Sequence, residues 1–207
     1  MKSILSGING PEDLRSLSIE QLDVLAQEIR EELVSTTAKT GGHLASSLGA
    51  VELILAMHYI YDFSHDHLVF DVGHQAYAHK LITGRRDDFN TLRCYGGICG
   101  FPKRAESPYD THDAGHASDS LSIALGLALA RDLDGGSESV VVLIGDAAIS
   151  GGMAFEALNH IGHVNTDMTV ILNDNEMSIS RNVGALSLYL AKARLSKPYI
   201  SARDNVE

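Results

Sequence analysis

The stretch Val140-Val141-Val142-Leu143-Ile144-Gly145-Asp146 sets the architecture of this chain, because it has the pattern of a buried strand that breaks at a polar turn. A run of small and apolar residues follows from Ala147 to Leu158 and predicts a helix. A second β-branched run, residues 168–172, then ends in Asn173-Asp174-Asn175. The pattern predicts a strand–turn–helix–strand unit with polar residues at both strand ends.

Asp146 and Asn175 follow the two predicted strands directly. In a parallel α/β sheet, ligands bind beyond the carboxyl ends of the strands, where helix N-termini offer unpaired backbone N–H groups. Mg²⁺ takes carboxylate and amide oxygens and keeps few protein ligands where phosphates and water fill its other positions. The two residues therefore suit a metal-bridged diphosphate, although an isolated Asp and Asn at strand ends are more often turn or capping residues.

Gly145-Asp146 followed by Asn175 resembles the motif by which thiamine-diphosphate enzymes hold Mg²⁺ and the cofactor diphosphate. The segments GMAFEALN (residues 152–159) and LNDNEMSIS (residues 172–180) closely resemble the 1-deoxy-D-xylulose-5-phosphate synthase family. The resemblance runs from roughly the first helix to Lys197. It implies the thiamine-diphosphate-binding fold, an α/β architecture of three layers in which a mostly parallel sheet carries helices on both faces.

The same resemblance implies the ligands of the cofactor's diphosphate end. Asp146, Asn175 and the backbone carbonyl of Met177 would hold Mg²⁺. The cofactor-binding residues there would be Gly145, Ala147, Ala148 and Asn175, with the two alanines offering backbone amides.

Two histidines are candidates for the reacting centre. His43 follows Gly41-Gly42, and such a residue is more often a cap or a loop residue, but the family has an active-site imidazole here. His74 follows a predicted strand over residues 68–72, and an imidazole at a strand end suits proton transfer near neutral pH. The resemblance makes both candidate catalytic residues and makes His74 a cofactor contact as well.

Gly115, His116 and Ala117 precede an Ala- and Leu-rich helix predicted over residues 120–133. Small residues before a buried helix let the backbone approach a ligand closely. The resemblance places this segment against thiamine diphosphate and makes all three residues cofactor-binding candidates.

The sequence departs from the family pattern at two places. Ala147 replaces the third glycine of the Gly-Asp-Gly motif, which would cost about 1 kcal/mol or more if that position needs positive φ and little if it does not. Gly115-His116-Ala117-Ser118-Asp119 replaces Gly-His-Ser-Ser-Thr. Asp119 would repel a diphosphate unless it faces away or caps the following helix.

The family joins pyruvate and glyceraldehyde 3-phosphate, with loss of carbon dioxide, to make a precursor of isoprenoids and thiamine. By this resemblance, residues 1–207 would correspond to its diphosphate-binding domain, and the pyrimidine-binding and C-terminal domains would have no counterpart in them. The activating glutamate belongs to a missing domain, so this chain alone is expected to be an inactive part of the transferase. Alternatives are the N-terminal subunit of a split enzyme with a separate pyrimidine-domain chain, a non-catalytic remnant that binds no cofactor, and a truncated product. The family's dimers suggest a homodimer.

The length of 207 residues allows one large domain or two small ones, and the composition, 44% hydrophobic and 21% charged, is that of an ordinary globular protein, which we expect to fold around a single sheet. The net charge of −11 argues against nucleic-acid and anionic-membrane partners, which need clustered Lys and Arg. No apolar run approaches the length of a transmembrane helix, and no signal peptide is apparent, so a cytoplasmic location is expected.

Overall fold

The computed structural model describes residues 3–174 and seven later positions, namely Ala185, Tyr189, Lys192, Leu195, Ser196, Ile200 and Ser201. The chain divides into two compact units, Met1–Asn175 and Glu176–Glu207. All helices and strands described below belong to the first unit.

Three parallel strands form the sheet, in the order β1 (His67–Phe70), β2 (Val140–Gly145), β3 (Thr169–Asn173). Phe70 pairs with Leu143, and Gly145 pairs with Asn173. Central β2 is buried from Val140 to Ile144, as expected for a continuous apolar strand covered on both faces. Because all three strands are parallel, their carboxyl ends meet at one edge of the sheet.

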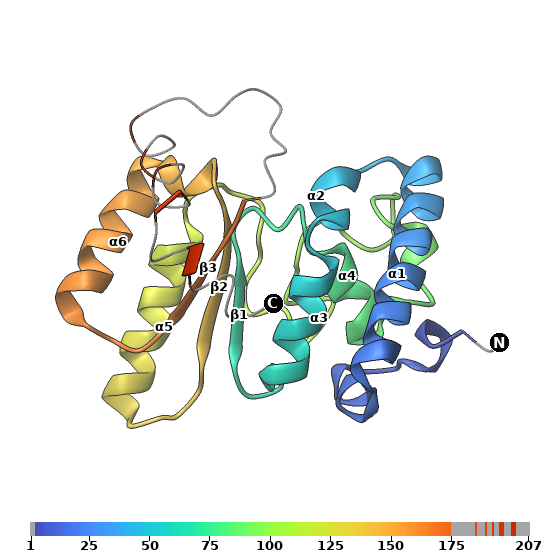
Figure 1. Ribbon diagram of the computed structural model, residues 1–207, viewed down its shortest axis with the longest axis horizontal. Coiled ribbons are helices and arrows are strands. Elements are labelled where there is room, and N and C mark those ends of the chain that lie inside the picture. The colour runs from blue at the N-terminus through green and yellow to red at the C-terminus, as the bar shows by residue number, and fades with distance from the viewer. Residues whose placement is uncertain are drawn as a thin grey trace. The chain divides into compact units, whose positions relative to one another are not determined.

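Helices cover both faces of this sheet, as Figure 1 shows. On one side lie α5 (Ser120–Asp134) and α6 (Gly152–Val164), and α5 contacts β1, β2 and α6. On the other side lie α1 (Ile19–Thr40), α2 (Leu44–Leu48), α3 (Val51–Ile60) and α4 (Tyr77–Lys80). The arrangement confirms the predicted three-layer α/β fold with a parallel sheet.

Short helical turns complete the described elements. Four of those in the described residues are 3-10 helices: η1 (Leu5–Gly7), η2 (Pro11–Ser16), η4 (Phe89–Thr91) and η5 (Ala148–Ser150). The turn η3 (Leu81–Arg85) has the hydrogen bonding of a π-helix and continues α4. The helix predicted from Ala147 to Leu158 is therefore two pieces, η5 and α6, which are separated at Gly151.

The predicted strand over residues 68–72 ends earlier than expected, at Phe70. Val72 and Gly73 both have positive φ, 59° and 82°, and they turn the chain out of the sheet. A β-branched residue with positive φ is unusual, so the apolar run predicted continued strand at Val72 where the chain instead turns. The turn places the residues that follow β1 at the carboxyl edge of the sheet.

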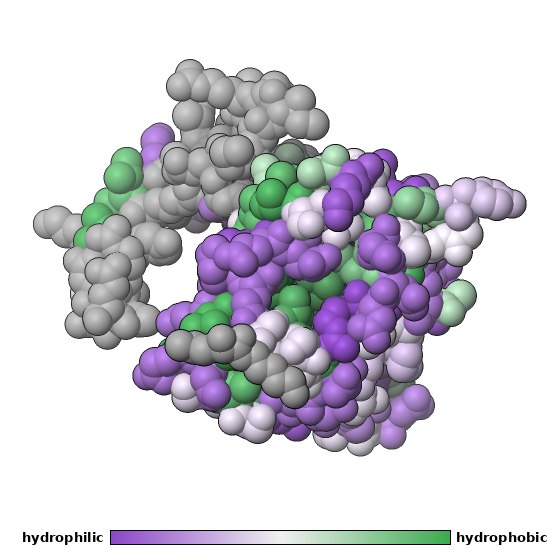
Figure 2. All heavy atoms as spheres, turned by 90° about the vertical axis from the view of Figure 1, so that its right-hand side faces the viewer, coloured by the Kyte–Doolittle hydropathy of each residue, from purple (hydrophilic) through white to green (hydrophobic). Residues whose placement is uncertain are grey.

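Helix α1 begins with a capping box, in which Gln21 N donates to Ser18 Oγ at 3.3 Å and Ser18 N donates to Gln21 Oε1 at 2.8 Å. Its apolar stripe, including Leu25, Ile29 and Leu33, is buried in the core. Figure 2 shows the side of the molecule that carries α1, where hydrophilic side chains cover most of the surface with small apolar areas between them.

None of the helices in the described part of the chain is long and apolar enough to cross a membrane. The predicted cytoplasmic location stays a prediction.

Candidate functional site

Asp71 is the anchor of the candidate site. It follows β1 directly and is 1% exposed. Its carboxylate accepts hydrogen bonds from the backbone N–H of Ser118, at 3.0 Å to each oxygen, and from the hydroxyl of Ser120 at 2.7 Å. Donors at the start of a helix compensate the burial of a negative charge. The loop that precedes α5 is therefore fixed to the end of β1.

Ser118 extends this connection to the end of β2. Its hydroxyl donates to the carbonyl oxygen of Ala148 at 2.8 Å, and its backbone has a φ of 73°. A Cβ at Gly151 would lie 2.8 Å from the Cβ of Ser118, closer than real Cβ contacts come. Glycine at 151 therefore allows two loops to pack together. We call residues 71–76, 115–120 and 145–151, with His43, the edge site.

His43 and His74 contact one another within the edge site. Their ring centroids are 5.6 Å apart with an interplanar angle of 68°, and the ring of Phe101 lies 6.0 Å from that of His43. The backbone N–H of His43 donates to the hydroxyl of Tyr77 at 3.3 Å. Gly42 has a φ of 137°, and a Cβ there would meet the same hydroxyl at 2.6 Å. Glycine thus brings the turn before His43 close to α4.

Partial burial affects the electrostatics of both imidazoles, although the side chain of His43 is exposed and that of His74 is half-buried. It lowers the pKa of His74, and the neighbouring His43 lowers it further, whereas the charge of Asp71 opposes the shift. Burial also lowers the pKa of His43, together with the positive charge of Arg93. Both rings are therefore neutral at pH 7 and able to donate at one nitrogen and accept at the other. His74 Nδ1 is buried and has no partner among the described residues.

The predicted loop Gly115, His116 and Ala117 lies at the same edge and is exposed. The carbonyl oxygen of His116 accepts a hydrogen bond from Val72 N at 3.1 Å. Gly115 has a φ of 149°, which favours glycine there. The structure therefore brings this loop beside the turn that carries His74, with the three predicted residues open to solvent.

Gly145, Asp146, Ala147 and Ala148 form the turn after β2. Ala147 has φ −70° and ψ −42°, an ordinary right-handed conformation. This position does not need positive φ, so alanine is accommodated without backbone strain. Among the described residues, no capping side chain bonds the start of η5 or of α6. Unpaired N–H groups at helix starts are what an anionic group requires.

Asp119 occupies the N-cap position of α5, but its side chain makes no capping hydrogen bond. Its Oδ1 atom is buried without a partner among the described residues. Burial lowers the pKa of His112, and the charge of Asp119 is the foremost influence that opposes this shift. The carboxylate of Asp119 therefore raises the pKa of His112 against the effect of burial. It does not cap α5, which was one of the two ways in which we expected it to avoid repelling a diphosphate.

Of the three predicted metal ligands, the structure describes only Asp146. Asn175 and Met177 lie outside the described residues, while Asp146 is half-buried at the end of β2. Within the described residues, no group of three or more His, Cys, Asp or Glu side chains could hold a metal ion. A site built from one carboxylate, one amide and one backbone carbonyl would not form such a group. The magnesium site stays a prediction.

Sequence reasoning did not single out Asp71, Ser118 or Phe101 as individual site residues. Asp71 stands in the same short segment as His74, but nothing in its spacing shows that it binds a loop 47 positions away. The positive φ of Ser118 has no signal in the sequence either. These roles depend on contacts between distant segments.

The chain is similar in sequence to proteins of one family. Residues 5–207 match the family model described as 1-deoxy-D-xylulose-5-phosphate synthase. Among relatives of that name, the protein of Syntrophomonas wolfei is 56% identical over 207 residues, which are 100% of this chain and 32% of the relative. A protein of Thermus thermophilus is 59% identical over 194 residues, which are 94% of this chain and 32% of the relative.

The chain thus spans about a third of the length of the relatives it matches. The match to the family model covers nearly all of its residues. Because of this match and the identity of 56–59% to these relatives, the chain belongs to the 1-deoxy-D-xylulose-5-phosphate synthase family.

Proposed function

We propose that this chain forms the diphosphate-binding part of a thiamine-diphosphate-dependent transferase that converts pyruvate and glyceraldehyde 3-phosphate to 1-deoxy-D-xylulose 5-phosphate and carbon dioxide. The observation that carries the proposal is the edge site itself. There, Asp71 and Ser118 join the loops that follow β1, precede α5 and follow β2. Family membership supports the reaction class.

The residues present suit the cofactor. The uncapped starts of η5 and α6 offer N–H groups for a diphosphate, and a Cβ at Gly152 would meet nothing within 4 Å, so the start of α6 is open. Asp146 and Asn175 supply the hard oxygen ligands that Mg²⁺ prefers. When bound, thiamine diphosphate supplies a carbon nucleophile that can add to the carbonyl group of pyruvate.

The chain's own side chains would bind and orient. Burial keeps His43 and His74 neutral by lowering the pKa of each, so His74 Nδ1 can pair with a polar group of the cofactor or substrate. His43, beside Phe101, would hold or move a proton at the substrate. His116 would contact the cofactor from its exposed loop. Phe101 would help to exclude water from the two imidazoles.

The first experiment is calorimetric titration of the 207-residue chain with thiamine diphosphate, with and without Mg²⁺. We expect saturable binding that requires Mg²⁺. Asp146→Ala should weaken it at least about tenfold, since removing a charged ligand from a metal site costs more than about 1.4 kcal/mol. Asp134→Ala, an exposed carboxylate at the end of α5, is the matched control and should bind as the wild type does.

Equal affinity of the Asp146→Ala and wild-type chains would contradict the metal assignment. Absence of binding even when the remaining domains are supplied as a separate chain would contradict the cofactor assignment and favour the non-catalytic remnant. If binding or synthase activity appears only with that second chain, the diphosphate part needs its pyrimidine-binding partner. Sedimentation of the same samples tests the proposed homodimer.

A further inference from the structure

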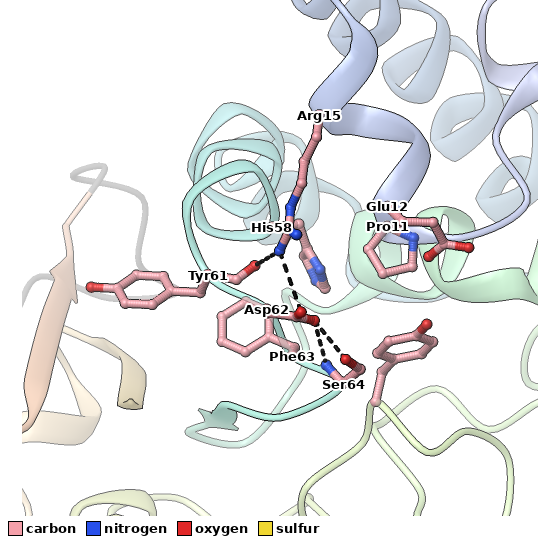
Figure 3. Close-up of a pocket in the computed structure, with 9 residues that line it drawn as sticks. Pro11, Glu12, Arg15, His58, Tyr61, Asp62, Phe63 and Ser64 are labelled. Atoms are coloured by element: carbon pink, nitrogen blue, oxygen red, sulfur yellow. Dashed lines mark hydrogen bonds and ion pairs between the residues drawn. The ribbon is translucent and has the colours of Figure 1, made fainter. Parts of the chain in front are cut away.

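A cavity of about 290 Å³ lies outside the edge site, at the C-terminal end of α3 (Figure 3). Arg15 of η2 lines it, donates to the carbonyl oxygen of Tyr61 at 3.3 Å and lies 3.8 Å from the carboxylate of Asp62. Asp62 also accepts a hydrogen bond from the hydroxyl of Ser64 at 2.6 Å. These polar groups satisfy one another and join η2 to the end of α3, so they serve the fold.

Ser118 of the edge site is in a different situation, because its backbone is held in an unfavourable conformation. Its φ is 73°, in the left-handed region that costs most residues other than glycine free energy. Its backbone N–H donates to both carboxylate oxygens of Asp71 at 3.0 Å, which fixes the residue against the end of β1. Glycine would suit this conformation better, so a serine here indicates that its side chain has a role.

The side chain of Ser118 bonds the turn that follows β2. Its hydroxyl donates to the carbonyl oxygen of Ala148 at 2.8 Å. A Cβ at Gly151 would overlap this hydroxyl, so glycine at 151 gives the bond its room. The bond therefore requires both a positive φ at residue 118 and the absence of a side chain at residue 151.

The hydrogen bonds within the turn fix its shape but not its place. Ser150 N donates to the carbonyl oxygen of Ala147 at 3.3 Å, and Gly151 N donates to that of Ala148 at 3.1 Å. Both bonds would move with the turn if it shifted relative to the sheet. The bond from Ser118 comes from outside the turn, so it ties the turn to the residue that Asp71 holds at the end of β1.

The bonded carbonyl also sets the direction of a neighbouring N–H group. The carbonyl of Ala148 and the N–H of Ile149 belong to one planar trans peptide and point in opposite directions. Because the carbonyl is bonded to Ser118 and the side chain of Ile149 is buried, this peptide has little freedom to rotate. The same turn carries Asp146 and Ala147, which the proposed function assigns to Mg²⁺ and the diphosphate.

We propose that Ser118 is a positioning residue for the diphosphate end of the cofactor: its hydroxyl holds the turn over residues 146–150 where that turn meets the diphosphate and Mg²⁺. Ser118 acts through the turn rather than by contact with the cofactor. The inference rests on the proposed function, because it requires that this turn binds thiamine diphosphate. Without the hydroxyl, the turn must become ordered at the moment of binding, and the affinity falls.

Two variants remove the hydroxyl but differ in backbone strain. Ser118→Ala keeps the cost of the positive φ, whereas Ser118→Gly removes it. Ser118→Gly should therefore unfold at a higher urea concentration than Ser118→Ala. In calorimetric titration, both should weaken the Mg²⁺-dependent binding of thiamine diphosphate about fivefold, the factor that corresponds to one hydrogen bond.

Ser16→Ala is the matched control. The hydroxyl of Ser16 also donates to a backbone carbonyl oxygen, that of Asp13, at 2.8 Å. Ser16 lies in η2, outside the edge site. This variant loses a bond of the same kind and length and should bind thiamine diphosphate as the wild type does.

Hydrogen exchange in the free chain tests the turn without any cofactor. The amide of Gly151 donates to the same carbonyl oxygen as the hydroxyl of Ser118, so a turn released from Ser118 should open more often. We expect this amide to exchange about fivefold faster in both Ser118 variants and at the wild-type rate in Ser16→Ala. NMR of the ¹⁵N-labelled chains measures these rates.

The inference is overturned if both Ser118 variants bind the cofactor as tightly as the wild type. It is also overturned if affinity follows stability, with Ser118→Gly close to the wild type and Ser118→Ala weaker, or if the Gly151 amide keeps its wild-type exchange rate in both variants. These results would leave the proposed function intact. Absence of binding by the wild type, with the remaining domains supplied as a separate chain, would overturn the proposed function and this inference with it.

Discussion

Asp71 holds the edge site together, because one buried carboxylate accepts hydrogen bonds from Ser118 and Ser120. Asp71→Asn keeps the shape but turns an NH₂ group or a weaker acceptor toward these donors. We expect a loss of about 1–3 kcal/mol in the free energy of unfolding, the cost of a buried charge-assisted hydrogen bond left unmade. Urea denaturation monitored by circular dichroism measures it.

The matched control is Asp113→Asn. Asp113 is half-exposed: its Oδ1 accepts from the backbone N–H of Arg104 at 2.9 Å, a bond that the Oδ1 of asparagine can keep, and the charged side-chain atoms of Lys103 and Arg104 are 3.9 Å away. This variant should change the free energy of unfolding by less than about 0.5 kcal/mol. If the two variants are equally stable, the role assigned to Asp71 is wrong.

Gly73 is the residue whose replacement should be most costly in the turn after β1. It has a φ of 82°, and a Cβ there would lie 2.5 Å from Cδ of Pro102. Gly73→Ala combines positive φ with overpacking and should destabilise the fold by about 2 kcal/mol or more. Gly126→Ala, at an exposed site within α5 where a Cβ would meet nothing within 4 Å, should stabilise it by about 0.5–1 kcal/mol. Relative to the wild type, the unfolding temperature should fall for Gly73→Ala and rise for Gly126→Ala.

Ala147 is a departure from the family motif that the structure explains. Its φ of −70° is available to any residue. Ala147→Gly should therefore not improve affinity for thiamine diphosphate and should lower stability by up to about 1 kcal/mol through the entropy of the unfolded chain. Calorimetric titration and denaturation of this variant check both statements. A large gain in affinity would mean that alanine obstructs the diphosphate.

At the scale of elements, a buried cluster of charges joins the α4–η3 segment to the loop over residues 99–110. Asp110 accepts from Arg85 and from Lys103 N, at 2.5 Å and 2.7 Å, and Lys80 pairs with Glu106 at 2.7 Å. Lys103 lies two positions after Phe101, the residue beside His43. The cluster therefore positions the loop that brings Phe101 beside His43.

Asp110→Asn leaves the buried guanidinium of Arg85 without its main counter-charge. We expect a loss of about 3–5 kcal/mol, the cost of breaking one partner out of a buried ion pair. The amide hydrogen of Lys103 should also exchange faster, because its acceptor is weakened. Stability within about 0.5 kcal/mol of the Asp113→Asn control would show that the cluster contributes nothing.

Over the whole molecule, buried histidines couple stability to pH. Burial lowers the pKa of His58 and His79 below the ordinary imidazole value, and it does the same for His43, His74 and His112. As pH falls below about 6.5, the unfolded chain binds protons that the folded chain does not. The free energy of unfolding should therefore fall steadily from about pH 7 to about pH 5, as urea titrations at each pH would show.

Removing one of these histidines should reduce that slope. His58→Phe should lower it by up to about 1.4 kcal/mol per pH unit, the contribution of one proton. His160→Gln replaces an exposed histidine of α6 and should keep the wild-type slope. A wild-type stability that is constant over this range would contradict the assignment of neutral buried rings.

Local patterns along the chain were sufficient to predict a strand–turn–helix–strand unit, and the resemblance to one family supplied the layered α/β fold. The apolar runs that became β2 and β3, the helical spacing of α1 and the capping box at Ser18 specify elements through neighbouring residues alone. The same patterns placed His74, Gly115 and Asp146 at element ends, where parallel strands deliver ligands. Resemblance to one family then assigned them roles.

How these ends are joined could be learned only from the folded molecule. Asp71 binding Ser118, His43 contacting His74, and the relay from His58 through His79 to Asp110 all connect residues far apart in the chain. The positive φ of Val72 and Ser118 is likewise imposed by packing, against the preferences of those residues. Neighbouring residues alone do not predict such contacts, because the contacts contribute free energy only after folding has brought distant segments together.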